Sequence, residues 1–386
     1  MNTMISLVKQ TISTEELQEL SKWIATNPRL TKGSLTDEFE KQWSEYLGVK
    51  HSIFVSSGSS ANLASFYAIK LSNRLKNNKV ILPTVSWSTT VSPAIQLGFD
   101  PILCDCNFDN LGLDIEHLEE LIDKHDPAMI VTVNVLGFAN NYDRIKEICD
   151  DKGIVLLEDS CESVGTVAYG KQTGCFGDLS TFSFFYGHHI STIEGGMVCT
   201  DDDELAMLIR SIRCHGWDRD LPEDSQKDLR EKYNIDDFHA SYTFYYPGFN
   251  VRCTEIQAFL GISQLEKIND IIKKRHENFL LYQDRLRDIN FLSLDDHSVV
   301  SNFAYPIIHP KCEQISKGLS DAQIEHRPLI VGSISRQPFW IDRYGLQDLK
   351  NGEEVHKNGL YVPNNYDMLD SEIELICDTI NREISK

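Results

Sequence analysis

The sequence predicts an α/β fold built on a mostly parallel sheet. Four short runs between residues 79 and 159 are apolar, rich in branched residues and closed by polar residues, and helical stretches separate them: KVILP, DPILCD, AMIVTVN and GIVLLED. This alternation is typical of a parallel sheet with helices on both faces. Active sites in such sheets lie beyond the carboxyl ends of the strands, so the residues that follow each run are the candidates for chemistry.

The length of 386 residues predicts two domains, because a single hydrophobic core seldom grows beyond about 250–300 residues. We expect a large α/β domain over residues 1–264. It includes an N-terminal helical segment, in which Ser13 and Glu16 have the spacing of a capping box. A smaller α+β domain is expected over residues 265–386, where NFAYPII and GLYVPNN are candidate strands.

Charge and cysteine usage exclude several classes of protein. The net charge of -21 repels polyanions, which argues against a nucleic-acid surface or an anionic-membrane patch. The ten cysteines do not have the spacing of a disulfide framework, and no segment approaches 18 uninterrupted apolar residues. We therefore expect a soluble cytoplasmic protein with reduced thiols.

Two segments that follow strands are candidate ligand contacts. VSSGSSANLASFYAIK passes from a strand end through Gly58 and Ser59 into a helix, and a helix N-terminus with free amides suits a phosphate. The alternative is an ordinary serine-rich helix cap. Trp87, in LPTVSWSTT, stands where an indole can stack on a flat heteroaromatic ring, and the alternative is that it only covers the end of the sheet.

Carboxylates close the next strand, in VLLEDSCESVG. Glu158 and Asp159 end the apolar run and Glu162 follows. A carboxylate at this place is costly unless it meets a cation, and a protonated pyridine nitrogen would supply one. Helix capping and metal binding are the alternatives. No metal is expected, because no His or Cys has the spacing of a closed metal site.

The stretch TFSFFYGHHISTIEGGMV contains Ser183 on a strand, the adjacent histidines His188 and His189, and an EGG run that starts at Glu194. A histidine taken alone is more often structural than catalytic. A role in chemistry therefore depends on whether the four segments belong to one site.

Taken in order, these segments resemble the DegT-type sugar aminotransferases, which have the aspartate-aminotransferase fold (PLP fold type I), and the resemblance covers nearly the whole chain. It implies a bound pyridoxal or pyridoxamine phosphate. Asp159 takes the position at the pyridine nitrogen, and Gly58, Ser59 and Ser183 take the phosphate positions, with Trp87 stacking on the ring.

One departure from the family decides the expected reaction. His188 stands five residues after the strand serine, where the family has the lysine that tethers the cofactor. Imidazole cannot form a Schiff base, so ordinary transamination is unavailable, but imidazole still moves protons near neutrality.

The histidine pair, HGW and PGFNVR resemble a lyase branch of the family, the pyridoxamine-phosphate-dependent 3-dehydratases of lipopolysaccharide O-antigen sugars. Glu162 stands where aminotransferases usually carry glutamine, and the resemblance implies that it contacts the cofactor. The resemblance implies a GDP-linked 4-keto-6-deoxy sugar as substrate and glutamate as the donor that restores the cofactor.

Further expectations follow from the same resemblance. Asn250 matches the family position that reaches the cofactor phosphate of the neighbouring subunit, which implies a homodimer with shared active sites. His215 and Arg219 are candidate substrate contacts, and a solvated loop is the alternative. A second histidine-bearing branch carries a [2Fe–2S] cluster on four cysteines. The cysteine spacing here does not match it, so neither a cluster nor a partner reductase is expected.

Several alternatives stay open at this point. One is an aminotransferase that lacks the usual lysine and uses another, such as Lys171. Another is a non-catalytic relative that binds a sugar nucleotide. The nucleotide (GDP, CDP or dTDP), the configuration of the sugar and the role of His189 are not fixed by the sequence.

Overall fold

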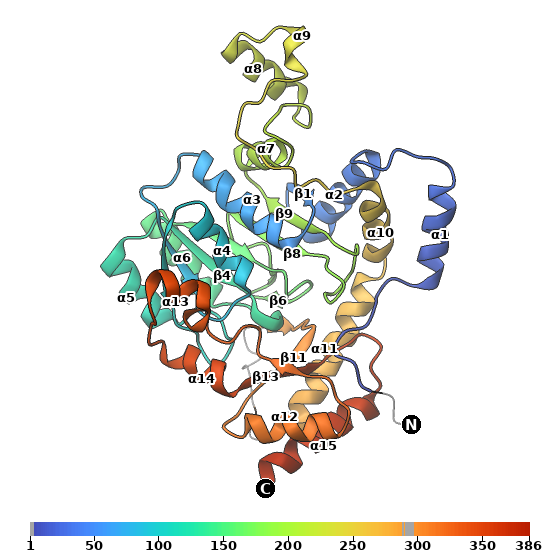
Figure 1. Cartoon of the computed structure of the whole chain (residues 1–386), viewed down its shortest axis with the longest axis vertical. Helices are drawn as coiled ribbons and strands as arrows, with labels where there is room; N and C mark the ends of the chain where they lie inside the picture. Colours follow the sequence, from blue (N-terminus) through green and yellow to red (C-terminus); the bar gives the residue numbers. More distant parts are fainter. Residues whose placement is uncertain (1–3, 288, 290–296) are drawn as a thin grey trace.

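The computed structural model describes residues 4–287, 289 and 297–386. A seven-stranded sheet with the strand order β1-β9-β8-β5-β4-β2-β3 forms its centre (Figure 1). Its strands are β1 (His51–Val55), β2 (Lys79–Pro83), β3 (Asp100–Cys104), β4 (Met129–Val133), β5 (Val155–Asp159), β8 (Leu179–Ser183) and β9 (Gly196–Thr200). The strand β9 pairs antiparallel with β1 and β8, whereas β8, β5, β4, β2 and β3 pair in parallel. The predicted mixed, mostly parallel sheet and its four predicted strands are confirmed.

Side chains of the central strands alternate between two cores, one on each face of the sheet. On β2, Val80 and Leu82 enter one core and Ile81 enters the other. The first core is covered by α3 (Gly58–Leu71), α4 (Ser88–Gln96) and α7 (Asp203–Ile212), and the second by α5 (Ile115–His125) and α6 (Tyr142–Lys152). Both faces are thus buried, which explains why the strands are continuous apolar runs.

The N-terminal helical segment begins as predicted. The Ser13 hydroxyl accepts the Glu16 N–H at 3.2 Å, and the Glu16 carboxylate accepts the Ser13 N–H at 2.6 Å. This capping box starts α1 (Thr14–Ile24), which packs beside α10 (Glu255–Leu265), while α10 also packs on α2 (Ser34–Leu47).

A second, three-stranded sheet lies in the C-terminal part of the chain, with the order β11-β13-β12. It consists of β11 (Ala304–Ile308), β13 (Gly359–Pro363) and β12 (Arg327–Pro328). Around it lie α11 (Ile268–Arg285), α12 (Cys312–Asp321), α14 (Lys350–Asn358) and α15 (Asp370–Ser385), whereas α13 (Pro338–Tyr344) packs its Trp340 into the first core of the seven-stranded sheet (Figure 1). A third small sheet has the order β10-β6-β7 and contains β6 (Val167–Ala168), β7 (Lys171–Gln172) and β10 (His297–Val299).

The N-terminal residues join the core of this C-terminal part. Ile5 forms a parallel bridge with Ile324, and the Leu7 N–H donates to the Glu325 carboxylate at 2.8 Å. The division into residues 1–264 and 265–386 stays a prediction, and residues 1–3, 288 and 290–296 of these ranges lie outside the described residues.

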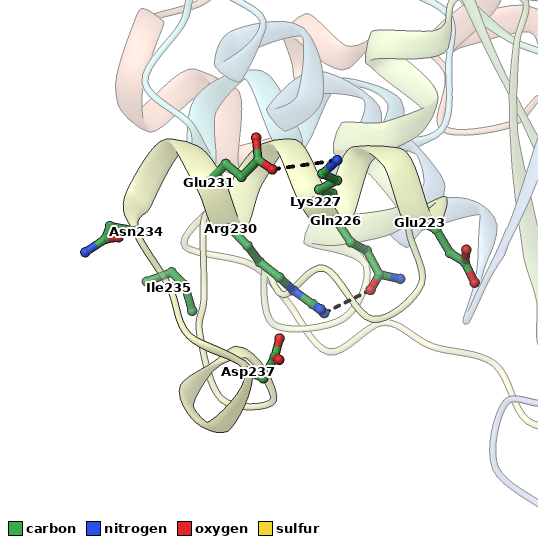
Figure 2. A pocket seen from close by; sticks show the side chains of 8 residues that line it. All are labelled: Glu223, Gln226, Lys227, Arg230, Glu231, Asn234, Ile235 and Asp237. Atoms are coloured by element: carbon green, nitrogen blue, oxygen red, sulfur yellow. Dashed lines mark hydrogen bonds and ion pairs between the residues drawn. The ribbon is translucent and has the colours of Figure 1, made fainter.

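An arm carrying α8 (Glu223–Tyr233) and α9 (Asp237–Ala240) stands away from the sheet (Figure 1). Figure 2 shows a pocket on this arm with charged and amide side chains along α8, where Arg230 donates to Gln226 at 2.9 Å. At the base of the arm the buried Arg213 pairs with Glu40 and Asp220. No residue of the predicted site lines this pocket, among those the structure describes.

The helices and the cysteines bear on the expectation of a protein without membrane spans and with reduced thiols. Within residues 4–287, 289 and 297–386, no helix is both long and apolar enough to cross a bilayer. All ten cysteines are free.

Candidate active site

A cavity of about 500 Å³ lies at the carboxyl ends of the parallel strands and extends to residues of the N-terminal and C-terminal segments. Seven of the residues predicted from the sequence line it together: Gly58, Ser59, Trp87, Asp159, Glu162, Ser183 and His188. They come from different strands and helices, and the fold places them in one site.

The N-terminus of α3 forms one end of the cavity. Ser57 caps the helix, and its hydroxyl accepts the Ser60 N–H at 3.1 Å. Gly58 is required here because a side-chain Cβ would lie 2.6 Å from Cβ of Ser183. The Ser59 hydroxyl lies 2.8 Å from the Thr89 hydroxyl. Hydroxyls and the positive end of a helix dipole therefore meet in a place that suits a phosphate.

Asp159 ends β5 and is 3% exposed. One carboxylate oxygen accepts from the Asn62 amide and the Thr90 hydroxyl, each at 2.8 Å, and the other accepts the Cys161 N–H at 3.1 Å. Over the described ranges of the chain, this carboxylate forms no ion pair with a Lys, Arg or His side chain. A buried anion held in place without a cation is costly, and a ligand with a protonated ring nitrogen would compensate it.

Glu158 points to the opposite face of β5. It is fully buried and accepts the N–H groups of Gly174, Phe176 and Gly177 at 2.5, 2.9 and 3.3 Å, and the Asn134 amide at 3.0 Å. These bonds fix the loop that precedes β8. Of the two adjacent carboxylates, only Asp159 faces the cavity.

Glu162 is held by a turn with unusual backbone angles. Its carboxyl accepts the Leu136 N–H at 2.7 Å, and Leu136 has φ 49° within the 3-10 turn η1 (Val135–Gly137). A non-glycine residue in this region stores strain, which is characteristic of functional sites. Burial, with a smaller contribution from the Asp159 charge, raises the pKa of Glu162 to about 8.

This raised pKa predicts a pH-dependent stability of the cofactor-free protein. Glu162 keeps a proton in the folded state that the unfolded chain releases near pH 4.5, so the free energy of unfolding falls as the pH rises toward about 8. The expected slope is up to about 1.4 kcal/mol per pH unit. It is measured by urea unfolding between about pH 6.5 and 8 as the difference in slope between the wild-type protein and Glu162→Gln, because the titration of the histidines is common to both proteins. Equal slopes in the two proteins would contradict the prediction.

His188 lies on the loop after β8 and lines the cavity. Its ring is 5.5 Å from the ring of Phe303, at an interplanar angle of 61°. Its buried Nδ1 has no hydrogen-bond partner among the described residues. Burial, with the nearby Arg275 guanidinium, lowers the pKa of His188 to about 4. The imidazole is therefore neutral at pH 7 and able to accept a proton.

His189 has a different environment from its neighbour. It is fully buried, and its Nε2 lies 2.9 Å from the Ser301 carbonyl oxygen, which fixes Nε2 as the donor. Burial lowers the pKa of His189 well below its usual value, so the ring is neutral. The structure makes His189 a buried structural contact, a role that the sequence left open.

Three predicted residues lie outside the cavity. Asn250 is exposed, and its side-chain oxygen accepts a hydrogen bond from Arg252 Nε at 3.1 Å. Arg252 therefore makes a local contact with Asn250. His215 forms the base of the arm with φ 62°. The Arg219 guanidinium lies 3.9 Å from the centre of the Trp217 ring, so within the chain it contacts the arm rather than the cavity.

Other lining residues were not predicted from the sequence. Asn62 and Thr90 hold Asp159. Their spacing from predicted site residues could have indicated them, because Asn62 is one helical turn after Gly58 and Thr90 lies in the first turn after Trp87. Arg327 and Tyr361 come from the C-terminal sheet. Nothing local in their sequence indicates that the fold brings them to the cavity.

The residues present fit a phosphorylated pyridine cofactor. The α3 N-terminus with Ser59 and Ser183 would hold the phosphate, Asp159 would hold the ring nitrogen, and Trp87, which is 54% exposed at the cavity, would cover the ring. Lys171 is exposed on β7 and does not line the cavity, so no lysine is found among its described lining residues.

Residues 10–381 match the model of the DegT/DnrJ/EryC1/StrS aminotransferase family. The chain is 34% identical to the GDP-4-keto-6-deoxy-D-mannose 3-dehydratase of Yersinia pseudotuberculosis, over 97% of this chain and 98% of the relative. It is 36% identical to the enzyme of the same name from Escherichia coli O55:H7, over 91% of this chain and 92% of the relative.

A solved structure gives the same result for the fold. The chain matches the crystal structure of GDP-4-keto-6-deoxymannose-3-dehydratase with a trapped PLP-glutamate geminal diamine with a TM-score of 0.89 and 33% identity, over 97% of this chain and 100% of the other. The predicted aspartate-aminotransferase fold is confirmed. The chain belongs to the DegT/DnrJ/EryC1/StrS aminotransferase family.

Proposed function

We propose that this protein is a pyridoxamine-phosphate-dependent 3-dehydratase of a nucleotide-linked 4-keto-6-deoxy sugar, with GDP-4-keto-6-deoxymannose as the substrate. The observation that carries the proposal is His188, a neutral imidazole that lines the cofactor-type cavity where the family has its lysine. The relatives with the same overall fold and about a third of the residues in common are named for this reaction.

The chain's own residues divide the work between binding and proton transfer. When bound, pyridoxamine phosphate would supply the electron pair that expels the 3-hydroxyl of the sugar, and it would be left in the aldehyde form. Asp159 would orient the ring through its nitrogen, and the α3 N-terminus with Ser59 and Ser183 would hold the phosphate in place of a covalent tether. His188 would take up the proton that the aminomethyl carbon of the cofactor gives up and return it to the departing 3-hydroxyl oxygen, because hydroxide leaves poorly unless it is protonated.

A low imidazole pKa suits this second task. Because burial lowers the pKa of His188, its imidazolium is a stronger acid than a solvent-exposed one, so it gives the proton back readily to the leaving oxygen. The nitrogen of the cofactor amine would leave as ammonia when water hydrolyses its bonds to the sugar and the cofactor, so the products are the 4-keto-3,6-dideoxy sugar, ammonia and pyridoxal phosphate. Glutamate then restores the amine of the cofactor in a half-reaction that uses the same His188.

Two other functions fit the cavity less well. An aminotransferase that tethers its cofactor through Lys171 conflicts with the exposed position of that lysine on β7. A non-catalytic sugar-nucleotide-binding relative has no use for Asp159, a buried carboxylate held by Asn62 and Thr90 at one end of the cavity.

The experiment that tests the proposal is an assay of ammonia release. Purified protein is incubated with pyridoxamine phosphate, glutamate and GDP-, CDP- or dTDP-linked 4-keto-6-deoxy sugars, and loss of the 3-hydroxyl is followed by mass spectrometry. Ammonia released in step with 3-deoxygenation of the GDP sugar supports the proposal. An amino sugar as the product, or a borohydride-reducible adduct between wild-type protein and pyridoxal phosphate, would overturn it.

We also propose a homodimer in which Asn250 reaches the cofactor phosphate of the other subunit. The support is that Asn250 is exposed and lies outside the cavity of its own chain, although its family position implies a cofactor contact. We further propose that the protein is cytoplasmic, and the ten free cysteines support this location.

Subunit mixing tests the shared site. Asn250→Ala and His188→Asn are each expected to be poorly active alone. After the two are unfolded and refolded together, mixed dimers regain one intact site, which restores roughly a quarter of wild-type activity. The control is a mixture of His188→Asn with Asp159→Asn. Both residues line the cavity of their own chain, so every site in the mixed dimer carries one of the two substitutions and no activity is regained. If the Asn250→Ala mixture gains no more activity than this control, Asn250 acts within its own chain.

A further inference from the structure

We propose that Thr166, Ser301 and His189 form a positioning network that sets His188 relative to Glu162. The inference rests on the proposed function, because it concerns the geometry of the residue assigned to proton transfer. It assigns a task to the second histidine of the pair and to two buried residues that do not line the cavity themselves.

The network begins at the turn that holds Glu162. Leu136 donates its N–H to the Glu162 carboxyl at 2.7 Å, and the next residue, Gly137, has φ 86°. The Gly137 carbonyl accepts the Thr166 hydroxyl at 2.8 Å. Thr166 is fully buried, and its hydroxyl therefore fixes the carbonyl end of the strained turn Val135–Gly137.

The same hydroxyl joins this turn to a second segment. Thr166 Oγ1 accepts the Ser301 N–H at 3.1 Å, so it is donor and acceptor at once. The backbones of Gly137 and Ser301 are in close contact, since a Cβ on Gly137 would lie 2.5 Å from the Ser301 carbonyl oxygen. The turn and residue 301 therefore cannot move independently without breaking buried hydrogen bonds.

Ser301 carries the connection to the histidine pair. Its carbonyl oxygen accepts from His189 Nε2 at 2.9 Å. Phe303, two residues further on, packs its ring 5.5 Å from the ring of His188. His188 is thus restrained from both sides, by its covalent neighbour His189 and by the wall that Phe303 provides. Both restraints originate at Ser301.

The consequence is a fixed spacing between the His188 imidazole and the Glu162 carboxyl, which both line the cavity. Proton transfer depends on heavy-atom distances that are set within a fraction of an ångström, and groups that orient such side chains affect rates by about 10- to 100-fold. The residues assigned to the cofactor phosphate and ring, Ser59 and Asp159, are not part of the network. Loss of the network should therefore slow the reaction without weakening binding.

The test compares three variants. Thr166→Val keeps the shape of the side chain and removes both hydrogen bonds, and Thr166→Ser keeps the hydroxyl. Thr173→Val is the matched control, because Thr173 is 1% exposed and its hydroxyl donates one hydrogen bond, to the Ser163 carbonyl at 2.7 Å. This variant keeps the backbone N–H of residue 173, which donates to the Thr166 carbonyl at 2.9 Å. Each variant is assayed for kcat, for KM of the GDP sugar and for pyridoxamine phosphate affinity, and its thermal stability is recorded.

We expect kcat to fall about 10- to 100-fold in Thr166→Val, with KM and cofactor affinity unchanged, and to recover in Thr166→Ser. Thr173→Val should lose stability and keep kcat. In cofactor-free protein, the imidazole NMR resonances of His188 should shift in Thr166→Val only. If kcat is unchanged in Thr166→Val, or falls equally in Thr173→Val, the positioning role is wrong.

A second variant covers the case in which Thr166→Val does not fold. His189→Phe keeps a buried planar ring and removes the donor to Ser301, and it should show the same selective loss of kcat. Unchanged kcat in this variant would also overturn the inference. An inactive wild-type protein would instead refute the proposed function, so the two failures are distinguishable.

Discussion

Replacing His188 with asparagine is expected to reduce ammonia release from the 4-keto sugar nucleotide by about 100- to 10,000-fold. The amide is similar in size but cannot take up and return a proton. Cofactor affinity should be unchanged, because phosphate and ring contacts are assigned to residues at other places in the cavity. Stopped-time ammonia assays, paired with absorbance titration of the cofactor, measure the two effects separately.

A lysine at the same position gives the complementary result. His188→Lys restores the amine that the family uses for tethering, so pyridoxal phosphate should become bound covalently and reducible by borohydride. Dehydration should be lost as in the asparagine variant. Full activity in His188→Asn would show that another group is the base, and the absence of any adduct in His188→Lys would show that residue 188 does not reach the cofactor.

Replacing Asp159 with asparagine is expected to weaken cofactor binding by about 10- to 100-fold, which corresponds to the loss of one hydrogen bond to a charged group. The carboxylate is buried, and Asn62 and Thr90 hold one of its oxygens. An amide keeps the shape but removes the charge that a protonated ring nitrogen requires. Activity should fall further than affinity, because an unprotonated ring is a weaker electron acceptor.

Asp178→Asn is the control for Asp159→Asn. The Asp178 carboxylate accepts the Leu156 N–H at 2.8 Å, near the opposite end of β5 from the cavity. Both variants lose one negative charge beside the same strand, but only Asp159→Asn should bind pyridoxamine phosphate less tightly in fluorescence titrations. Equal affinities in the two variants would mean that Asp159 has no role at the ring nitrogen.

Much of the sheet and one side of the site could be predicted from the sequence, because both depend on local patterns. Apolar runs closed by polar residues predicted the strands, and parallel strands must end at one edge, which brought Asp159, Ser183 and Gly58 together. Neighbouring residues of a strand face opposite sides of the sheet. Asp159 therefore faces the cavity, whereas Glu158 binds the loop before β8 on the other side.

The rest of the site depends on contacts between distant parts of the chain. Phe303, Arg327 and Tyr361 reach the cavity from the C-terminal part, and no local pattern marks them. The role of His189 is set by the Ser301 carbonyl, a backbone group that every sequence contains. The sequence predicts His215 and Arg219 as substrate contacts, but neither lines the cavity of its own chain, and Arg219 packs on Trp217 instead.

The cavity wall also has a consequence for protein synthesis. Leu7 and Val8 line it from the beginning of the chain, while Tyr361 lines it from β13, close to the end. When the last strand of the central sheet, β9, has been synthesised, the residues that line the cavity from the C-terminal part of the chain are still missing. A chain that stops before β13 therefore lacks the Tyr361 side of the cavity wall, even though it contains every strand of the central sheet.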